Sequence, residues 1–293
     1  MLNEVFEFAS AKINLNLLVL PKREDGFHEI ESIFQVVDVK DTLVVYPEEG
    51  LDSCKIECDD MVLPENNTLS LAYRAFGKVS GTDNRAVKVK LSKKIPSGGG
   101  LGGGSSDAAA LIRALEKINA VKLTDVQLDE IASCVGSDVF FFVHCDGNKG
   151  GCALVKGRGE KVFKICKRSD LFFVLVFPGV HSSTKEAYAL VDEQNMAVRG
   201  NHHSDEIPRA EDLERIYNLP VGKWNFVNSF TSALSDKYPE IRSCIEELKA
   251  QNALFCDMSG SGSTVFGVFA SRCDAENAVA AIKAKGRNCV FAE

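Results

Sequence analysis

A glycine-rich run at residues 96–109, PSGGGLGGGSSDAA, constrains the fold and function of this chain more than any other segment. Six of the eleven residues from 96 to 106 are glycine. Because glycine has no side chain, successive backbone N–H groups can converge on an anion, and the backbone can adopt positive φ angles. The run leads into a helical pattern with one apolar stripe, made of Ala108, Leu111, Ile112, Leu115 and Ile118. A phosphate held by the loop would therefore also face the positive end of a helix.

Three other interpretations of the run fit less well. A P-loop needs a lysine after its last glycine, and none follows Gly104. The dinucleotide pattern GxGxxG is matched by Gly98, Gly100 and Gly103, but such a match is common in any run of glycines. The preceding strand pattern alternates lysine with valine, whereas a dinucleotide fold begins on a strand buried on both faces. A flexible linker seldom opens an amphipathic helix, so the run indicates a phosphate-binding loop.

The composition is that of a globular protein, with 45% apolar and 26% charged residues among 293. The net charge is −7 without a long basic block, which argues against a nucleic-acid partner. No apolar run is long enough to cross a bilayer and the first ten residues carry no basic residue, so we expect no membrane partner and a cytoplasmic location. Ten scattered cysteines without a C-x-x-C pair are expected to be mostly small buried apolar residues rather than metal ligands.

Hydrophobic periodicity predicts two α/β domains that meet near residue 155. Strands are expected at residues 4–20, at 34–46 in two pieces around a turn at 38–41, and at 86–95, 171–177, 253–257, 264–269 and 288–291. Helices are expected at residues 67–79, 108–118, 124–134, 239–251 and 274–285. The glycine-containing segment 147–159 is expected to form turns at the domain boundary, and the polar segment 195–208 a surface loop.

The motifs of this chain, in their order, resemble those of the GHMP kinases, the superfamily that includes galactokinase, homoserine kinase and mevalonate kinase. The doubled glycine form resembles the branch that acts on 4-diphosphocytidyl-2-C-methyl-D-erythritol in the non-mevalonate isoprenoid pathway. Further segments are similar to that branch: AKINLNL at residues 11–17, DGFHEIESIFQ at 25–35, GSDVFFF at 136–142 and PGVHSSTKEAY at 178–188. SGSGST at residues 259–264 resembles the third superfamily motif, so the agreement covers nearly the whole chain.

The resemblance implies the α+β, two-domain fold of the GHMP kinases, with an N-terminal ATP-binding domain at residues 1–155 and a C-terminal, ferredoxin-like substrate domain at residues 156–293. It implies transfer of the ATP γ-phosphoryl group to the 2-hydroxyl of a cytidyl diphosphate-linked methylerythritol, with Mg²⁺ as the second cofactor. The enzyme is expected to be a monomer or a weak homodimer. Such a transfer needs an in-line hydroxyl, neutralisation of the moving charge, and a group that orients or accepts the proton.

Lys12 and Asp138 are the implied catalytic pair. Without the resemblance, Lys12 on the polar side of a strand indicates a solvent-facing side chain, and Asp138 after a glycine-serine turn indicates a turn or cap residue. The resemblance implies instead that Asp138 is the catalytic acid/base and Lys12 its ion partner. A lysine in that place would stabilise the charge of the transferring phosphoryl group and keep the neighbouring carboxylate ionised.

The resemblance also implies a substrate site with Asn14, Phe27, His28 and Tyr188. Phe27 and His28 match the place where the family reads the cytosine ring, and Tyr188 matches the opposing aromatic residue. Many members carry tyrosine where this chain has Phe27; the change keeps the aromatic face and removes a phenol hydrogen bond. His28 alone would indicate a structural histidine.

The implied ATP-binding residues are Asn67 and Lys93, which match adenine-pocket positions, and the loop residues Pro96, Ser97, Gly98, Gly99, Gly100, Leu101, Gly102, Gly103, Gly104, Ser105 and Ser106. The Mg²⁺ ligand stays open, with Ser106 and Asp107 as candidates. The family places the turn at residues 259–263 beside the phosphates of the substrate, although its sequence also fits a plain connection between two strands. His181, His202 and His203 are assigned no role.

Other functions stay open at this point. A GHMP kinase for homoserine or mevalonate would carry a similar loop, and DGFHEIESIFQ favours the cytidyl substrate over these. A nucleotide-binding protein without catalysis would have lost its base, whereas both Lys12 and Asp138 are present. A hydride-transferring dehydrogenase would be distinguished by binding NADH.

Overall fold

Two β-sheets form the framework of the computed structural model, which describes residues 3–24, 26–145, 151–197 and 207–293, the side chains of 195–197 excepted. In the first sheet β1 pairs antiparallel with β2 along nearly its whole length, while β5 and β4 pair with opposite ends of β2. The strand order is β3-β4-β2-β5-β6, with β1 beside β2. The strands of this sheet are β1 Val5–Lys22, β2 His28–Leu51, β3 Cys54–Cys58, β4 Arg85–Ser92, β5 Cys152–Gly157 and β6 Lys161–Ile165.

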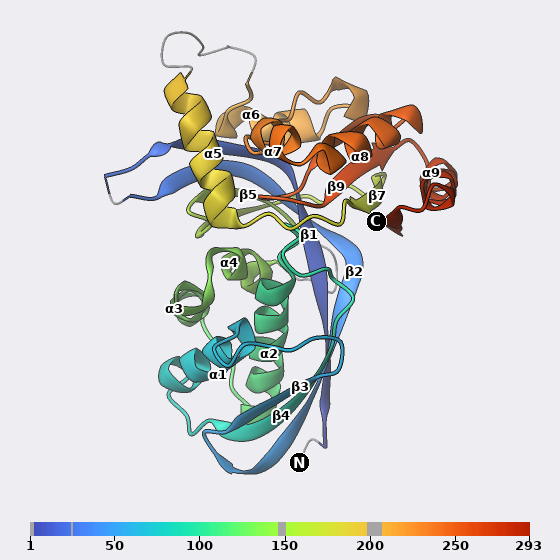
Figure 1. Cartoon of the computed structure of the whole chain (residues 1–293). Helices are drawn as coiled ribbons and strands as arrows, with labels where there is room; N and C mark the ends of the chain where they lie inside the picture. The colour runs from blue at the N-terminus through green and yellow to red at the C-terminus, as the bar shows by residue number, and fades with distance from the viewer. Residues whose placement is uncertain (1–2, 25, 146–150, 198–206) are drawn as a thin grey trace.

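The second sheet is antiparallel, in the order β10-β7-β9-β8. Its strands are β7 Phe172–Phe177, β8 Phe255–Met258, β9 Val265–Phe269 and β10 Asn288–Ala292. The chain therefore has the predicted α+β architecture. Figure 1 shows the long strands β1 and β2 running from the part that carries the first four helices to the part that carries the others.

The helices fall into two groups along the chain. The first group is α1 Thr68–Val79, α2 Gly103–Asn119, α3 Asp125–Val135 and α4 Ser137–His144. The second group is α5 Thr184–Ala197, α6 Ala210–Tyr217, the 3₁₀ turn η1 Val221–Lys223, α7 Thr231–Lys237, α8 Pro239–Ala250 and α9 Arg272–Ala284. No helix within the described ranges is long and apolar enough to span a membrane.

The helix starts follow from local sequence. The side chain of Asn67 accepts a hydrogen bond from the backbone N–H of Ser70 and so caps α1. Thr124 and Gln127 form a reciprocal capping box at α3. α2 begins directly after Gly102, whose φ of 70° lies in the left-handed region that favours glycine. The last residues of the glycine run therefore become the first turn of a helix, as the sequence predicts.

The turn predicted at residues 38–41 is wrong, because β2 continues through this segment. The register of β1 against β2 shifts between Ser10 and Ala11, whose partners are Lys40 and Val37. The two extra residues of β2 are thus accommodated as an irregularity of the ladder rather than as a turn between two strands. Asp41 is fully buried there rather than exposed at a turn.

The core links the two parts of the chain. One hydrophobic cluster packs α1, α2 and α3 against the first sheet. A second cluster joins residues of β1, β2 and β5 to β7, α8 and α9, and a third joins β1 to β7, α6 and β9. Residue 155, where the two domains were predicted to meet, lies within β5, and β5 and β6 extend the first sheet. Of the predicted turn segment 147–159, residues 152–157 are strand, and 147–150 lie outside the described residues.

Candidate functional site

A cavity of about 1800 Å³ lies beside the glycine loop and is lined by both parts of the chain. Ligand pockets usually measure about 300–1,000 Å³, so this one has room for two nucleotide-sized molecules. Its walls are loop residues 96–104, the ends of β1 and β2 around Phe27, the start of α4, residues 181–185 before and at the start of α5, and the turn at 260–262. All of the site residues predicted from the sequence line it except Ser106.

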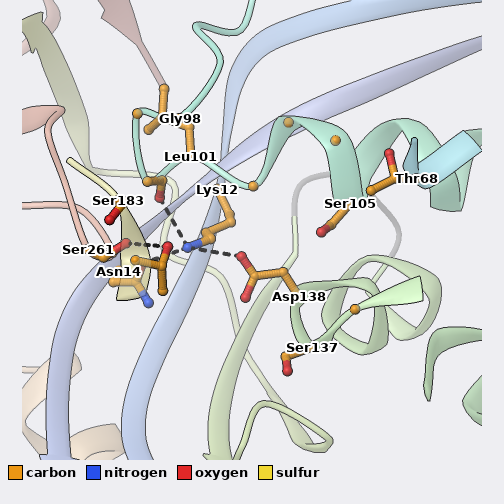
Figure 2. A pocket seen from close by; sticks show the side chains of 18 of the residues that line it. Lys12, Asn14, Thr68, Gly98, Leu101, Ser105, Ser137, Asp138, Ser183 and Ser261 are labelled. Atoms are coloured by element: carbon orange, nitrogen blue, oxygen red, sulfur yellow. Dashed lines mark hydrogen bonds and ion pairs between the residues drawn. The ribbon is translucent and has the colours of Figure 1, made fainter. Parts of the chain in front are cut away.

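Lys12 and Asp138 meet at the centre of this cavity (Figure 2). The Nζ atom of Lys12 lies 3.4 Å from Oδ2 of Asp138, although the residues are far apart in the sequence. Lys12 Nζ also donates hydrogen bonds to Oδ1 of Asn14, at 2.7 Å, and to the carbonyl oxygen of Gly100, at 3.1 Å. The Lys12 side chain is 4% exposed and the Asp138 side chain 32% exposed, so the carboxylate faces the cavity and the ammonium lies buried behind it.

Two strands and a helix hold this pair in place. The backbone N–H of Lys12 donates to the carbonyl of Leu101, which ties β1 to the glycine loop. Asn14 donates from its amide to Oγ of Ser32 on β2, so its oxygen is directed at Lys12. Asp138 is in the first turn of α4, whose N-terminal end favours a negative charge. Asp138 is thus a residue of the first helical turn and does not cap the helix, and the fold places the Lys12 ammonium beside it.

The glycine loop is packed against the turn at residues 259–264. Gly98, Gly100 and Gly102 have φ angles of 69°, 78° and 70°, which only glycine adopts readily. Oγ of Ser259 donates to the carbonyl of Gly100 at 3.0 Å, and the backbone N–H of Thr264 donates to the carbonyl of Gly99 at 3.2 Å. The predicted third motif thus contacts the loop directly, and Gly260, Ser261 and Gly262 line the cavity.

The aromatic residues of the predicted substrate site, Phe27, His28 and Tyr188, line the same cavity. The rings of His28 and Tyr188 stack with their centroids 5.2 Å apart. Nδ1 of His28 is 2.8 Å from the carbonyl oxygen of Leu20; because a carbonyl only accepts, this nitrogen carries the proton. Nε2 is 3.2 Å from Oδ1 of Asp192 without the alignment of a hydrogen bond. Burial and the charge of Asp138 raise the pKa of Tyr188 to about 12, so its phenol remains a hydrogen-bond donor.

Phe27 is 55% exposed and lies beside an arginine that sequence reasoning missed. The guanidinium carbon of Arg158 is 4.7 Å from the centre of the Phe27 ring. Both residues line the cavity. The segment GRGE at residues 157–160 could have signalled a turn, but nothing in it indicates which aromatic ring the arginine would contact.

Asn67 and Lys93 line the cavity with their polar ends engaged by the protein. The amide of Asn67 caps α1 and donates to the carbonyl of Pro64. Nζ of Lys93 makes ion pairs with Asp41 and with Asp107, the latter at 2.8 Å. Burial, together with the Asp41 carboxylate, raises the pKa of Asp107. Burial alone would lower the pKa of Lys93, but the two carboxylates outweigh it and raise that pKa, so Lys93 remains an ammonium ion.

The candidate metal ligands differ in their access to the cavity. Ser105 lines it, whereas Ser106 is 3% exposed and does not. One oxygen of Asp107 is taken by Lys93, and the other is buried without a hydrogen-bond partner. Because Mg²⁺ prefers oxygen ligands with open access to phosphates and water, Ser105 fits this ion better than either predicted candidate.

Several further polar residues line the cavity beyond those predicted. Oγ1 of Thr184 is 3.0 Å from Oγ of Ser261, which links the start of α5 to the 259–264 turn. The imidazole of His181 lies against Gly98, where a Cβ atom would approach it to 2.6 Å. The hydroxyl-rich stretch HSST at residues 181–184 was the available signal for this wall. His202 and His203 lie outside the described residues.

Comparisons with known proteins match both parts of the chain to one kinase family. The family model of the GHMP kinase N-terminal domain matches residues 67–146, and that of the GHMP kinase C-terminal domain matches residues 210–288. The chain is 40% identical to a 4-diphosphocytidyl-2-C-methyl-D-erythritol kinase of Thermotoga petrophila, over 88% of this chain and 90% of the relative.

Two solved structures of kinases match the chain over nearly its whole length. A crystal structure of a 4-(cytidine 5'-diphospho)-2C-methyl-D-erythritol kinase matches with a TM-score of 0.76 and 27% identity, over 98% of both chains. A homoserine kinase of Cytophaga hutchinsonii matches with a TM-score of 0.67 and 20% identity, over 99% of this chain and 94% of that one, and shares the fold.

Proposed function

This chain belongs to the 4-diphosphocytidyl-2-C-methyl-D-erythritol kinases of the GHMP family, and we propose that it transfers the γ-phosphoryl group of ATP to the 2-hydroxyl of that substrate. The observation that carries this proposal is the position of Lys12 and Asp138. They form an ion pair beside the carbonyl of Gly100, in the same cavity as Phe27, and thus between a phosphate-binding loop and an aromatic site.

The two ends of the cavity suit two different ligands. Backbone N–H groups of the glycine loop and of the first turn of α2 are the donors available for the ATP phosphates. Phe27, His28 and Tyr188 offer aromatic faces and a ring nitrogen for the cytosine base. The methylerythritol part of the substrate would then lie between these ends, at Asn14 and Asp138.

The chemistry follows from the groups that meet there. The 2-hydroxyl oxygen attacks the γ-phosphorus, the bond from this phosphorus to the β–γ bridging oxygen breaks, and ADP leaves. The hydroxyl proton passes to the Asp138 carboxylate, which is the base nearest to the acceptor. The Lys12 ammonium, 3.4 Å from that carboxylate, offsets the negative charge of the phosphoryl group as it moves.

Mg²⁺ belongs to this proposal as the companion of ATP. The Ser105 hydroxyl, in the first turn of α2, lines the cavity and would be one ligand, and the phosphate oxygens and water would complete the coordination. When bound, the ion supplies charge neutralisation at the phosphates. The proposal includes a monomer or a weak homodimer as the acting form, in the cytoplasm, where ATP is available.

The experiment that tests this function is the identification of the product. The protein is incubated with Mg-ATP and 4-diphosphocytidyl-2-C-methyl-D-erythritol, and the reaction is followed by phosphorus NMR. We expect a new monophosphate ester resonance in step with ADP. L-homoserine and mevalonate, tested in parallel, are expected to give neither. Equal or greater turnover of either compound would assign the chain a different acceptor.

A further inference from the structure

Three charged side chains are buried together beneath the glycine loop. Asp41 on β2 is fully buried, Asp107 on α2 is 3% exposed, and the side chain of Lys93, directly after β4, is 10% exposed. Lys93 Nζ forms ion pairs with both carboxylates. Burying charged groups costs several kcal/mol for each ion, so a network of this kind is retained only where its geometry is useful or well compensated.

Each member of this network is joined to a different part of the loop. Oδ1 of Asp41 accepts hydrogen bonds from the backbone N–H groups of Lys94 and Ile95, at 2.5 and 2.8 Å, which are the last residues before Pro96. Asp107 belongs to the first two turns of α2, which follow the loop directly. Lys93 thus ties the strand that enters the loop to the helix that leaves it.

The tip of Lys93 also lies directly below the loop backbone. A Cβ atom placed on Gly103 would be 3.3 Å from Lys93 Nζ and 3.0 Å from Cγ2 of Ile95. Gly103 is the first residue of α2, where the backbone N–H groups have no partner within the helix. The position of Lys93 therefore limits how far this first turn can move towards the sheet.

We propose that the Asp41–Lys93–Asp107 network is a positioning device that holds the loop and the first turn of α2 in the geometry that receives the ATP phosphates. Lys93 then acts from beneath the backbone and is not a contact of the adenine ring. Asp107 fits poorly as a Mg²⁺ ligand, because the Lys93 ammonium already lies between it and Asp41. This inference rests on the proposed use of the loop for ATP.

If the network acted on ATP only through its net charge, it would weaken ATP binding instead of supporting it. The network holds two carboxylates and one ammonium, so its formal charge is negative beneath a site for a polyanion. Its contribution to ATP binding therefore lies in geometry rather than in attraction. Lys93→Met and Asp107→Asn change the net charge in opposite directions, yet both weaken the network. Positioning therefore predicts weaker ATP binding in both variants, whereas an effect of net charge predicts opposite changes.

The test measures binding of the non-hydrolysable analogue AMP-PNP to the full-length protein by calorimetry, without acceptor. Loss of a charge-assisted hydrogen bond predicts an affinity about tenfold lower in Lys93→Met and about fivefold lower in Asp107→Asn. The control Lys94→Met removes a neighbouring exposed lysine that does not line the cavity, and it is expected to stay within about twofold of the wild type. Asp107→Asn keeps shape and acceptor oxygen, so it remains informative should Lys93→Met fail to fold.

Two further readouts distinguish positioning from other roles. Adenosine, which lacks phosphates, is expected to compete equally well in the wild type and in Lys93→Met, whereas an adenine contact would weaken it in parallel with AMP-PNP. In steady-state assays KM for ATP is expected to rise, while kcat and KM for the acceptor stay within about twofold. This pattern means that the variant binds ATP more weakly by the same amount in the ground state and in the transition state.

Tighter AMP-PNP binding in Asp107→Asn, unchanged binding in both variants, or an equal loss for adenosine would each overturn the inference. A wild-type protein that binds AMP-PNP but does not phosphorylate the cytidyl substrate would contradict the proposed function and leave this inference standing, so the two failures are distinguishable.

Discussion

Gly100 shows how closely a single residue in the loop is determined by its neighbours. Its φ angle is 78°, and a Cβ atom would overlap the backbone carbonyl of Ser259, lying 2.9 Å from its carbon. Backbone cannot rotate away as a side chain can, so Gly100→Ala has to displace either the loop or the 259–264 turn. Its carbonyl also accepts from Lys12.

We expect Gly100→Ala to lower kcat/KM at least about 100-fold, because displacements of about 1 Å at a catalytic centre have effects of this size. Steady-state assays measure it. Gly222→Ala serves as the control, since Gly222 has an ordinary φ angle and a Cβ atom added there would meet no atom within 4 Å, so this variant should behave like the wild type. Activity of Gly100→Ala within about fivefold of the wild type would show that the loop does not need this contact.

At the residue scale, the sequence singled out individual side chains but could not show which of them contact one another. The resemblance implied Lys12 and Asp138, and the fold brings them to 3.4 Å. The ion pair of Lys93 with Asp41 could not be foreseen, because residues 52 positions apart meet only through the register of β2 and β4. Arg158 was missed for the same reason.

At the scale of elements, periodicity located most helices and strands but misjudged polar residues inside long strands. The charged residues at 38–41 read as a turn, whereas β1 pairs with β2 on both sides of them. A strand of 24 residues is unusual, and nothing in its local sequence indicates that it runs through both parts of the molecule. Pairing with β1 determines that these residues form a strand, and β1 lies outside any local window of the sequence.

Asp257, a buried acid where β8 meets α7, is expected to make stability depend on pH. Asp257 accepts hydrogen bonds from Oγ1 of Thr231 and from the N–H of Met258, yet burial raises its pKa to about 6. An acid with a higher pKa in the folded state than in the unfolded chain binds protons more tightly when folded. The contribution of Asp257 to stability is therefore greatest below about pH 4, falls as the pH rises to about 6, and stays lower above that.

Asp257→Asn keeps the acceptor oxygen and removes the charge. We expect it to raise the free energy of unfolding at pH 8 by up to about 3 kcal/mol, since one pKa unit corresponds to about 1.4 kcal/mol. The gain should shrink towards zero near pH 4, where the wild-type carboxyl is protonated. Urea unfolding at the two pH values measures it, and an equal difference at both would assign the effect to packing instead of charge.

At the scale of the whole molecule, two of the three hydrophobic clusters formed by the described residues join both parts of the chain. Two domains with separate cores would unfold in separate steps, whereas a shared core couples them. Local composition near residue 155 cannot show that β1 and β2 extend into both parts.

We therefore expect one cooperative unfolding transition. Trp224, the only tryptophan, lies in the core that joins β1 to β7, so its fluorescence reports on the second part of the chain. Far-UV circular dichroism reports on all helices and strands. The two signals should give coincident urea transitions in the protein without ligand. Transitions separated by more than about 1 M urea would mean that the two parts are stable independently.

The placement of Asp138 against Lys12, within reach of both ligands, is most directly tested by the turnover of Asp138→Asn. The substitution keeps the shape of the side chain and removes its ability to accept a proton. We predict that kcat with Mg-ATP and 4-diphosphocytidyl-2-C-methyl-D-erythritol falls at least about 100-fold, while AMP-PNP binds with wild-type affinity. A kcat within about threefold of the wild-type value would contradict the assignment of Asp138 as the catalytic base.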